Sequence, residues 1–125
     1  MKTKSGQNQK WIVRPGHRDA MRALFLKAFD AALSTPMDGL DLFKLSDGLS
    51  VGVFYEDDAL DEAQARKGAW LEFAVDDAAA GAALLEKLGV ARVAYSDTTH
   101  AYFQAPGGPV FRVAGAAGAA GGGAS

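Results

Sequence analysis

The chain has 125 residues, of which 49% are hydrophobic and 22% are charged, a composition typical of one globular domain or of two small units sharing a core. The formal net charge of −2 comes from interspersed charges, so the sequence shows no clustered Lys and Arg for nucleic-acid binding. Zero cysteines exclude disulfides and thiolate sites, and no apolar run reaches the roughly 20 residues that span a membrane, so we expect a cytoplasmic protein.

The first half of the chain begins with a polar segment, residues 1–10, that has nothing to bury and predicts a disordered leader. A short strand over residues 11–14 follows and is stopped by Pro15. From Arg18 to about Leu33 the apolar residues recur at helical spacing, which predicts an amphipathic helix. The first half therefore starts as a strand followed by a helix.

A hairpin ends the first half. Two strand-like runs, residues 40–45 and 49–55, flank an Asp-Gly turn at residues 47–48, which is a strong short-range hairpin signal. The acidic and then mixed segment 56–67 predicts a linker with a helical turn near Ala63.

The second half shows the same order more clearly. A strand begins at Trp70, and a helix follows over residues 78–88. Asp76 or Asp77 can cap this helix, and Gly89 can end it in the left-handed conformation. Three strand-like runs then close the unit: residues 90–95, 100–104 and 110–113.

Two alignments at nearly equal offset indicate that the halves are copies of one unit. Trp11 aligns with Trp70 at an offset of 59 residues, and Phe43 aligns with Phe103 at an offset of 60. The predicted organisation has five parts: a leader (1–10), a first unit (11–55), a linker (56–67), a second unit (68–114) and a flexible Ala/Gly tail (115–125).

Strand alternation sorts the side chains onto two faces, because successive residues of a strand point to opposite sides of a sheet. The predicted helix-facing set is almost purely apolar: Ile12, Phe43, Leu45, Val51, Val53, Tyr55, Leu71, Phe73, Val75, Phe103, Phe111 and Val113. The opposite set mixes aromatic and polar groups, among them Trp11, Val13, Gly52, Trp70, Glu72, His100, Tyr102, Gln104 and Arg112. Two tryptophans and a tyrosine on that face favour either a ligand pocket or a dimer interface.

Three segments carry a family resemblance: WLEFAVDD (70–77), LLEKLGV (84–90) and YFQAPGGPVFRV (102–113). Together they resemble the vicinal oxygen chelate superfamily, which includes glyoxalase I, bleomycin-resistance proteins and extradiol dioxygenases. The resemblance implies an α+β fold in which two tandem βαβββ modules form curled mixed sheets around a cavity, commonly within a homodimer. One strand of the first module is not visible in the sequence and is expected to be short or irregular near residues 35–38.

Metal enzymes of this superfamily place their ligands on the first and last strands of the modules. By the repeat, these positions fall on Trp11, Gly52, Trp70 and Arg112. None offers the His nitrogen or carboxylate oxygen that a catalytic divalent metal needs, and a guanidinium repels a cation. The sequence therefore predicts no metal and no cofactor, and it argues against glyoxalase or dioxygenase chemistry.

Several of the candidate residues also have an ordinary structural explanation. Arg112 can hold an anionic ligand through its planar fork, but an ion pair with Glu72 on the same face is the interpretation we favour. Trp11 and Trp70 can stack on a flat ligand or fill the space that metals occupy elsewhere in the superfamily. His100 and Glu72 are weak candidates for acid–base catalysis, and no catalytic residue is assigned.

The favoured function is metal-independent binding of a bulky, partly aromatic or anionic small molecule. The predicted ligand-binding residues are Trp11, Trp70, Glu72, Tyr102, Gln104 and Arg112. Two alternatives stay open: a metal-free lyase, isomerase or hydrolase that uses Arg112 with His100 or Glu72, and a sensing or interaction module with the mixed face buried at a subunit contact. The expected partners are a small molecule and a second copy in a homodimer, without nucleic acid or membrane.

Overall fold

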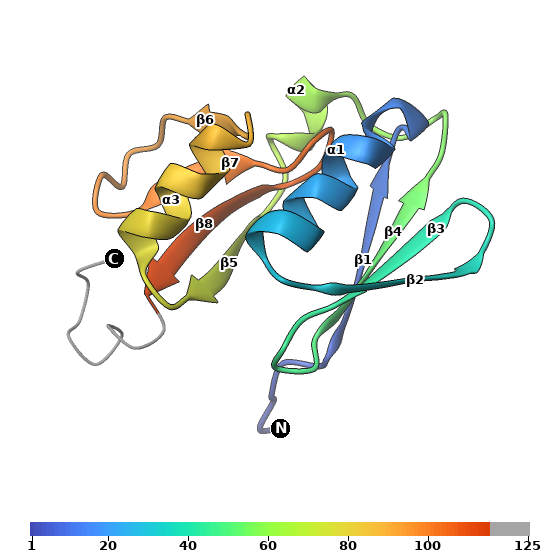
Figure 1. Cartoon of the computed structure of the whole chain (residues 1–125), viewed down its shortest axis with the longest axis horizontal. Coiled ribbons are helices and arrows are strands. Elements are labelled where there is room, and N and C mark those ends of the chain that lie inside the picture. Colours follow the sequence, from blue (N-terminus) through green and yellow to red (C-terminus); the bar gives the residue numbers. More distant parts are fainter. Residues whose placement is uncertain (116–125) are drawn as a thin grey trace.

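The computed structural model describes residues 1–115, which form two modules with the same order of elements (Figure 1). The first module contains β1 (Asn8–Val13), the 3-10 turn η1 (Pro15–His17), α1 (Arg18–Ala23), the π-helical turn η2 (Leu24–Ala28), β2 (Ala32–Met37), β3 (Leu40–Lys44) and β4 (Ser50–Tyr55). The second contains β5 (Trp70–Val75), α3 (Ala78–Lys87), β6 (Ala91–Val93), β7 (Ala101–Gln104) and β8 (Val110–Gly115), and the short α2 (Glu62–Ala65) lies between the modules in sequence. The predicted α+β fold of two tandem βαβββ modules is confirmed.

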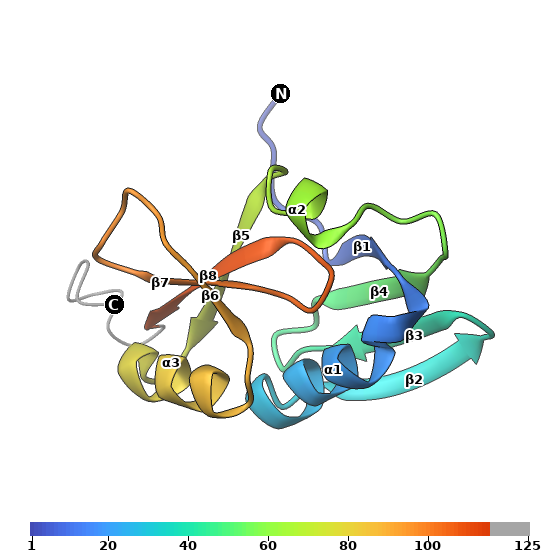
Figure 2. The same ribbon diagram turned by 90° about the horizontal axis from the view of Figure 1, so that it is seen from above.

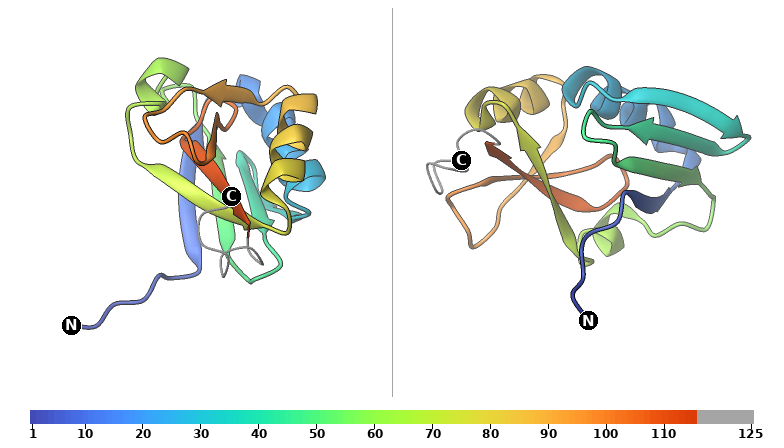
Figure 3. Two further views of the ribbon diagram at one scale, coloured as in Figure 1. Left: turned by 90° about the vertical axis from the view of Figure 1, so that its left-hand side faces the viewer. Right: turned by 90° about the horizontal axis from the view of Figure 1, so that it is seen from below.

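Each module forms one four-stranded sheet with the same topology. The strand orders are β1-β4-β3-β2 and β5-β8-β7-β6, and in each sheet the first and last strands of the module pair in parallel. The registers also correspond, since Asn8 pairs with Ser50 and Trp70 pairs with Val110 at the start of each parallel pair. The two sheets curve beside each other without closing (Figure 3).

The two modules share one hydrophobic core. The helices α1 and α3 lie next to each other on the same side of the molecule (Figure 2). Phe29 of the first module contacts Phe73 and Phe111 of the second, with ring centroids 4.8 and 5.5 Å apart. Phe25 stacks on Phe43 at 4.4 Å and meets Phe73 edge-on. Because these rings come from both halves, neither module buries its apolar face alone.

Two predictions about the first module are wrong at their boundaries. Strand β1 begins at Asn8, because residues 8–10 pair with residues 50–52 of β4, so they do not belong to a disordered leader. The predicted helix over 18–33 ends at Ala28. Asp30 then adopts a φ of 52°, a left-handed conformation that interrupts a helix.

The strand expected near residues 35–38 is β2. It pairs with β3, and its register shifts between Ser34 and Met37, which is the irregularity that the sequence predicted. The hairpin of β3 and β4 and the helical turn near Ala63 are confirmed. No helix within residues 1–115 is long and apolar enough to cross a membrane. Residues 116–125 of the predicted tail lie outside the described residues.

Candidate groove and outward-facing network

The face of β1 is the reverse of the one predicted. Trp11 pairs with Val53, and Phe73 pairs with Val113, so Trp11 corresponds to Phe73 and not to Trp70. Trp11 is accordingly buried in the core, whereas Ile12 is 43% exposed. The prediction aligned Trp11 with Trp70, which lies three residues before Phe73. A shift by an odd number of residues exchanges the two faces of a strand.

The alignment of the β3–β4 and β7–β8 hairpins is correct. Phe43 pairs with Val51 and Phe103 with Phe111, and all four side chains are fully buried on the helix side. The repeat therefore assigns the faces of Phe43 and Phe103 correctly in the hairpins and fails in β1. Residues 11–13 are all apolar, so alternation gives no indication of the face there.

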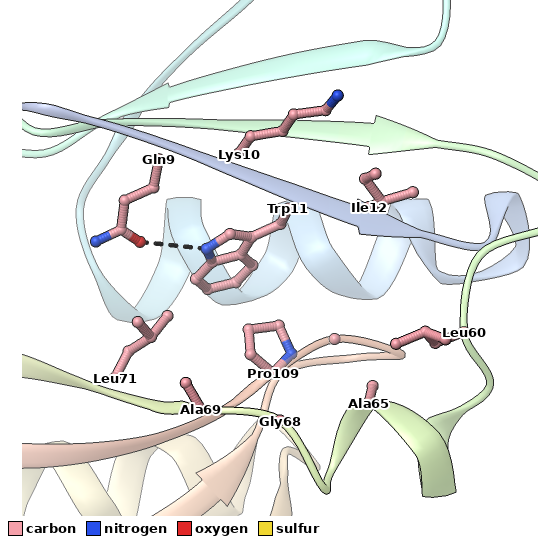
Figure 4. A pocket seen from close by; sticks show the side chains of 11 residues that line it. Gln9, Lys10, Trp11, Ile12, Leu60, Ala65, Gly68, Ala69, Leu71 and Pro109 are labelled. Atoms are coloured by element: carbon pink, nitrogen blue, oxygen red, sulfur yellow. Dashed lines mark hydrogen bonds between the residues drawn. The ribbon is translucent and has the colours of Figure 1, made fainter.

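One cavity is an open groove between β1 and the start of β5, with a volume of about 560 Å³ (Figure 4). Its apolar side chains are those of Trp11, Ile12, Leu60, Ala65, Ala69, Leu71 and Pro109. The indole of Trp11 points from β1 toward Pro109, and its Nε1 donates a hydrogen bond to Gln9 Oε1 at 3.2 Å (Figure 4). Trp11 thus belongs both to the core and to the wall of the groove.

The groove offers few polar groups. Lys10 also contributes to its lining, but its side chain points away from Pro109 (Figure 4), and its Nζ lies 4.9 Å from the ring centroid of Phe54. No acidic or histidine side chain lines the groove. A concave, mainly apolar surface of this size suits a small molecule, and its lining contains no acid–base pair for catalysis.

A polar network covers the outward face of the second sheet, the face opposite the helices. Arg112 donates from Nε to Glu72 at 2.8 Å and from Nη1 to Tyr102 Oη at 3.0 Å and Asp97 at 3.3 Å. The predicted ion pair between Arg112 and Glu72 is therefore confirmed. With two carboxylates around it, Arg112 has its charge already neutralised.

Asp97 is the member of this network that sequence reasoning missed. Its carboxylate accepts bonds from the Thr99 hydroxyl at 2.6 Å, the Thr99 backbone N–H at 2.8 Å and Tyr102 Oη at 2.9 Å, and lies 2.8 Å from His100 Nδ1. The bonds from Thr99, followed by that from Tyr102, hold the pKa of Asp97 well below its usual range. The signal was an Asp two residues before a Thr, a pattern that favours a local side-chain turn. We call Glu72, Asp97, His100, Tyr102 and Arg112 the Asp97 network.

The predicted ligand-binding residues do not share one cavity. Trp11 lines the groove, whereas Trp70 lines a second, smaller cavity of about 290 Å³. Trp70 is 38% exposed, and the guanidinium of Arg112 lies 4.3 Å from its ring centroid. Gln104 is buried among backbone groups and Arg66. Trp11 and Trp70 therefore line different cavities, and the ligand-binding roles of the predicted residues stay predictions.

A second polar network lies on the helix side of the first sheet. Asp41 has no exposed surface and accepts bonds from Arg18 at 3.0 Å, from Arg22 at 2.8 Å to each of its oxygens, and from Tyr55 at 2.9 Å. Burial would raise the pKa of Asp41, but the bonds from Arg22, Arg18 and Tyr55 outweigh it and lower the pKa to about 2. Burial and the bond to Asp41 raise the pKa of Tyr55. We call these four residues the Asp41 network.

The residues at the ligand positions of the superfamily do not fit a divalent metal. In the parallel pairs, the predicted positions Gly52 and Arg112 lie opposite Lys10 and Glu72, which are on the same strands as Trp11 and Trp70. This set contains one carboxylate, which is bound to a guanidinium, and two cations. Within residues 1–115 no group of three or more His, Cys, Asp or Glu side chains is placed to hold a metal ion.

No family model matches the sequence, and no curated protein matches it either. Solved structures do match. The chain is similar to the fosfomycin resistance protein FosX from Mesorhizobium loti, with 21% identity over 90% of this chain and 91% of that chain and a TM-score of 0.69. A structure assigned to the glyoxalase family from Bacillus anthracis has 14% identity over 90% and 95% of the two chains, with a TM-score of 0.67.

FosX from Listeria monocytogenes, solved with Mn(II) and a sulfate ion, has 14% identity over 91% of each chain and a TM-score of 0.67. These neighbours are members of the vicinal oxygen chelate superfamily, so the resemblance seen in the sequence is confirmed at the level of the fold. The chain therefore has the paired βαβββ fold of glyoxalase and fosfomycin-resistance proteins.

Proposed function

We propose that this chain is a metal-independent small-molecule-binding protein. Its ligand, a bulky and partly aromatic compound, binds in the groove between β1 and the start of β5. The observation that carries this proposal is the groove itself, because a cavity of about 560 Å³ with mainly apolar walls lies beside Trp11 and has no carboxylate or histidine in its lining. A site of this kind can bind and sequester a compound by apolar burial, and its lining provides no acid–base pair to activate it.

Metal independence is supported by the chemistry of the side chains at the superfamily's ligand positions. Lys10 and Arg112 bring two positive charges to these positions, and Glu72 is held by Arg112. A divalent cation bound by Glu72 would have to displace that ion pair and approach the guanidinium of Arg112. We therefore expect ligand binding to be unchanged by metal chelators.

The proposal is tested with N-phenyl-1-naphthylamine, a neutral aromatic probe whose fluorescence rises in apolar surroundings. In the variant Trp70→Phe, Trp11 is the sole tryptophan, so energy transfer from it reports binding in the groove. The methyl group of Ala69 points into the groove (Figure 4), and Ala69→Phe should fill it and weaken probe binding by at least about tenfold. Ala94→Phe, in the lining of the second cavity, is the matched control.

Binding that survives Ala69→Phe, or that is abolished by EDTA and restored by Mn²⁺, would contradict the proposal. If Ala94→Phe weakened probe binding as much as Ala69→Phe does, the probe would not bind specifically in the groove. Circular dichroism and thermal unfolding of both variants show whether each still folds, so that lost binding is not confused with lost structure.

A second candidate function, metal-free acid–base catalysis, is favoured by one observation. His100 Nδ1 lies 2.8 Å from Asp97, an arrangement that orients an imidazole, and the His100 side chain keeps 15% of its surface exposed. Glu72 and Arg112 are already paired with each other, so His100 would be the reactive group. Turnover of any compound that disappears in His100→Gln while binding is retained would support this function.

We further propose that the protein is a cytoplasmic homodimer. The outward face of the first sheet presents Ile12, which is 43% exposed, beside the partly buried Phe54. Apolar side chains on an open sheet face are typical of subunit contacts. Sedimentation equilibrium should give twice the monomer mass, and Ile12→Lys should shift the protein toward the monomer.

A further inference from the structure

The second cavity lies beside the outward face of the second sheet, apart from the groove. Its volume is about 290 Å³, and its main lining residues are Arg66, Lys67, Trp70, Val93, Tyr95 and Val110. Within the described part of the chain, Gly68 is the one residue that lines both this cavity and the groove. The combination of exposed aromatic rings with two cationic side chains makes this cavity chemically unlike the apolar groove.

The aromatic side chains of the cavity form a corner around Tyr102. The ring of Tyr95 stacks on Tyr102, with centroids 4.6 Å apart and planes inclined by 24°, whereas Trp70 meets Tyr102 at 5.9 Å and 90°. Trp70 and Tyr95 are therefore steeply inclined to each other. Both are open to solvent, at 38% and 47% exposure, while Tyr102 is buried. A flat ring can stack on one of these side chains and meet the other edge-on, which is a favourable arrangement of aromatic pairs.

The charge at the cavity comes from Arg66 and Lys67. Among residues 1–115 they are the only charged residues that line it, and both are cationic. Arg112 cannot serve as the anion anchor, since Glu72 and Asp97 already neutralise it. Those two carboxylates are the nearby groups that would oppose an anion, but they are bonded to Arg112 and neither lines the cavity.

The guanidinium of Arg66 is held in place by Gln104. Arg66 Nε donates to Gln104 Oε1 at 3.0 Å, and Gln104 Nε2 donates to the backbone oxygens of Glu62 at 2.8 Å and Gly108 at 3.1 Å. Gln104 is only 2% exposed, so these bonds fix which way its oxygen points. Within residues 1–115 the terminal nitrogens of Arg66 bond to no protein group. They remain available for a bidentate bond to an acidic group.

We propose that the second cavity binds a planar aromatic anion, such as an aromatic carboxylate. The ring lies in the corner of Trp70 and Tyr95, and the acidic group pairs with Arg66, with Lys67 as a second cation. Gln104 acts as a positioning residue for Arg66. This site is separate from the groove, so it does not depend on the function proposed for the groove.

The test uses 2-naphthoate and its neutral analogue 2-naphthamide, measured by isothermal titration calorimetry on the full chain. Wild type should bind the acid at least about tenfold more tightly than the amide, because the acid gains a charge-assisted hydrogen bond. Arg66→Gln should remove this preference, because it should weaken the binding of the acid and leave the binding of the amide unchanged. Gln104→Ala should reduce the preference, a readout that a purely structural role of Gln104 would not move. Trp70→Leu should weaken both compounds.

Arg112→Gln is the control, and it should leave the preference for the acid in place. Equal binding of acid and amide by wild type, no binding of either, or a preference that survives Arg66→Gln but disappears in Arg112→Gln would each overturn the proposal. Ala69→Phe separates the two sites, since it should leave naphthoate binding unchanged. Failure at the second cavity is thereby distinguished from failure at the groove, where N-phenyl-1-naphthylamine is the probe.

Discussion

The two modules share a register but place their polar networks on opposite faces of the sheet. In the first module the Asp41 network lies on the helix side, where Arg18 and Arg22 of the helix contact a fully buried carboxylate. In the second module the Asp97 network lies on the outward side, around Arg112 and Glu72. The paired strands show this difference directly. Asp41 pairs with Val53 in the first sheet, and at the equivalent position of the second sheet Ala101 pairs with Val113, so the helix side carries a carboxylate in the first module and a methyl group in the second.

The two modules therefore have the same strand register, although the side chains on each face of the sheet differ between them. The Asp41 network fastens a helix to its sheet, because it joins residues of α1 to β3 and β4. The Asp97 network joins residues of β5, β7 and β8 to the loop between β6 and β7, and it supports the exposed indole of Trp70. The first network is therefore expected to serve stability, and the second to hold a surface in place.

The largest expected effect separates the two tryptophans. Trp11→Ala removes a core side chain that contacts Phe25 and Phe73, and should lower the free energy of unfolding by about 3–5 kcal/mol. Trp70→Ala removes a side chain that is 38% exposed and should lower it by about 1 kcal/mol. Urea unfolding followed by circular dichroism measures both. Similar losses of unfolding free energy in the two variants would show that the two tryptophans contribute equally to stability. If Trp11→Ala does not fold, Trp11→Phe provides a milder substitution.

The next effect compares the two networks. Asp41→Ala leaves Arg18, Arg22 and Tyr55 around a buried position without an acceptor, and should lower the free energy of unfolding by about 3 kcal/mol. Asp97→Ala should cost clearly less, because water can reach the partners that it leaves. The same urea titrations decide the comparison, and a larger loss in Asp97→Ala would reverse the roles assigned to the networks.

Lowering the pH should reduce the free energy of unfolding through protonation of Asp41 in the first module. The folded state holds its pKa at about 2, below the ordinary value of 3.8, so the folded protein binds fewer protons than the unfolded chain. The resulting stabilisation, about 2 kcal/mol, is present above about pH 5 and is lost as the pH falls toward 2. The free energy of unfolding of wild type should therefore fall more steeply than that of Asp41→Asn over this range. Parallel curves for the two proteins would show that Asp41 does not carry this dependence.

The sequence predicted the fold more fully than the site, and the reason lies in particular residues. In the hairpins Phe43 aligns with Phe103 and Gly48 with Gly108, and a buried face fixes the register there. In β1 three consecutive apolar residues hide the face, so the resemblance of Trp11 to Trp70 was misleading. Arg112 and Glu72 were correctly paired because they lie on adjacent strands.

Other parts of the site depend on contacts that no local pattern shows. Arg66 meets Gln104 across 38 residues of sequence, and the groove joins β1 to the start of β5. Asp41 looked like one polar residue in a strand, because its arginines lie 23 and 19 residues earlier in the chain. Long-range pairings of this kind are fixed by packing of the modules, and periodicity carries no information about them.

The smallest expected effect concerns how each module holds its helix. Whereas α1 is fastened by the Asp41 network, α3 is held by an exposed ion pair of Glu86 with Arg92 and by packing of Gly81 against β5. A Cβ at position 81 would lie 3.1 Å from Val75 Cγ2, so Val75 would have to move by a few tenths of an ångström. Gly81→Ala should stabilise the helix by about 1 kcal/mol through its higher helix propensity. The close contact with Val75 should offset part of this stabilisation.

A pair of backgrounds separates these two contributions. In wild type, Gly81→Ala should raise the free energy of unfolding by about 0.5 kcal/mol, whereas in Val75→Ala, where the crowding atom is absent, the same change should give the full gain of about 1 kcal/mol. Urea unfolding of the four proteins in this cycle measures the difference. Equal gains in both backgrounds would mean that α3 does not rest on Val75, and that the second module is fastened chiefly by its surface ion pair and the shared core.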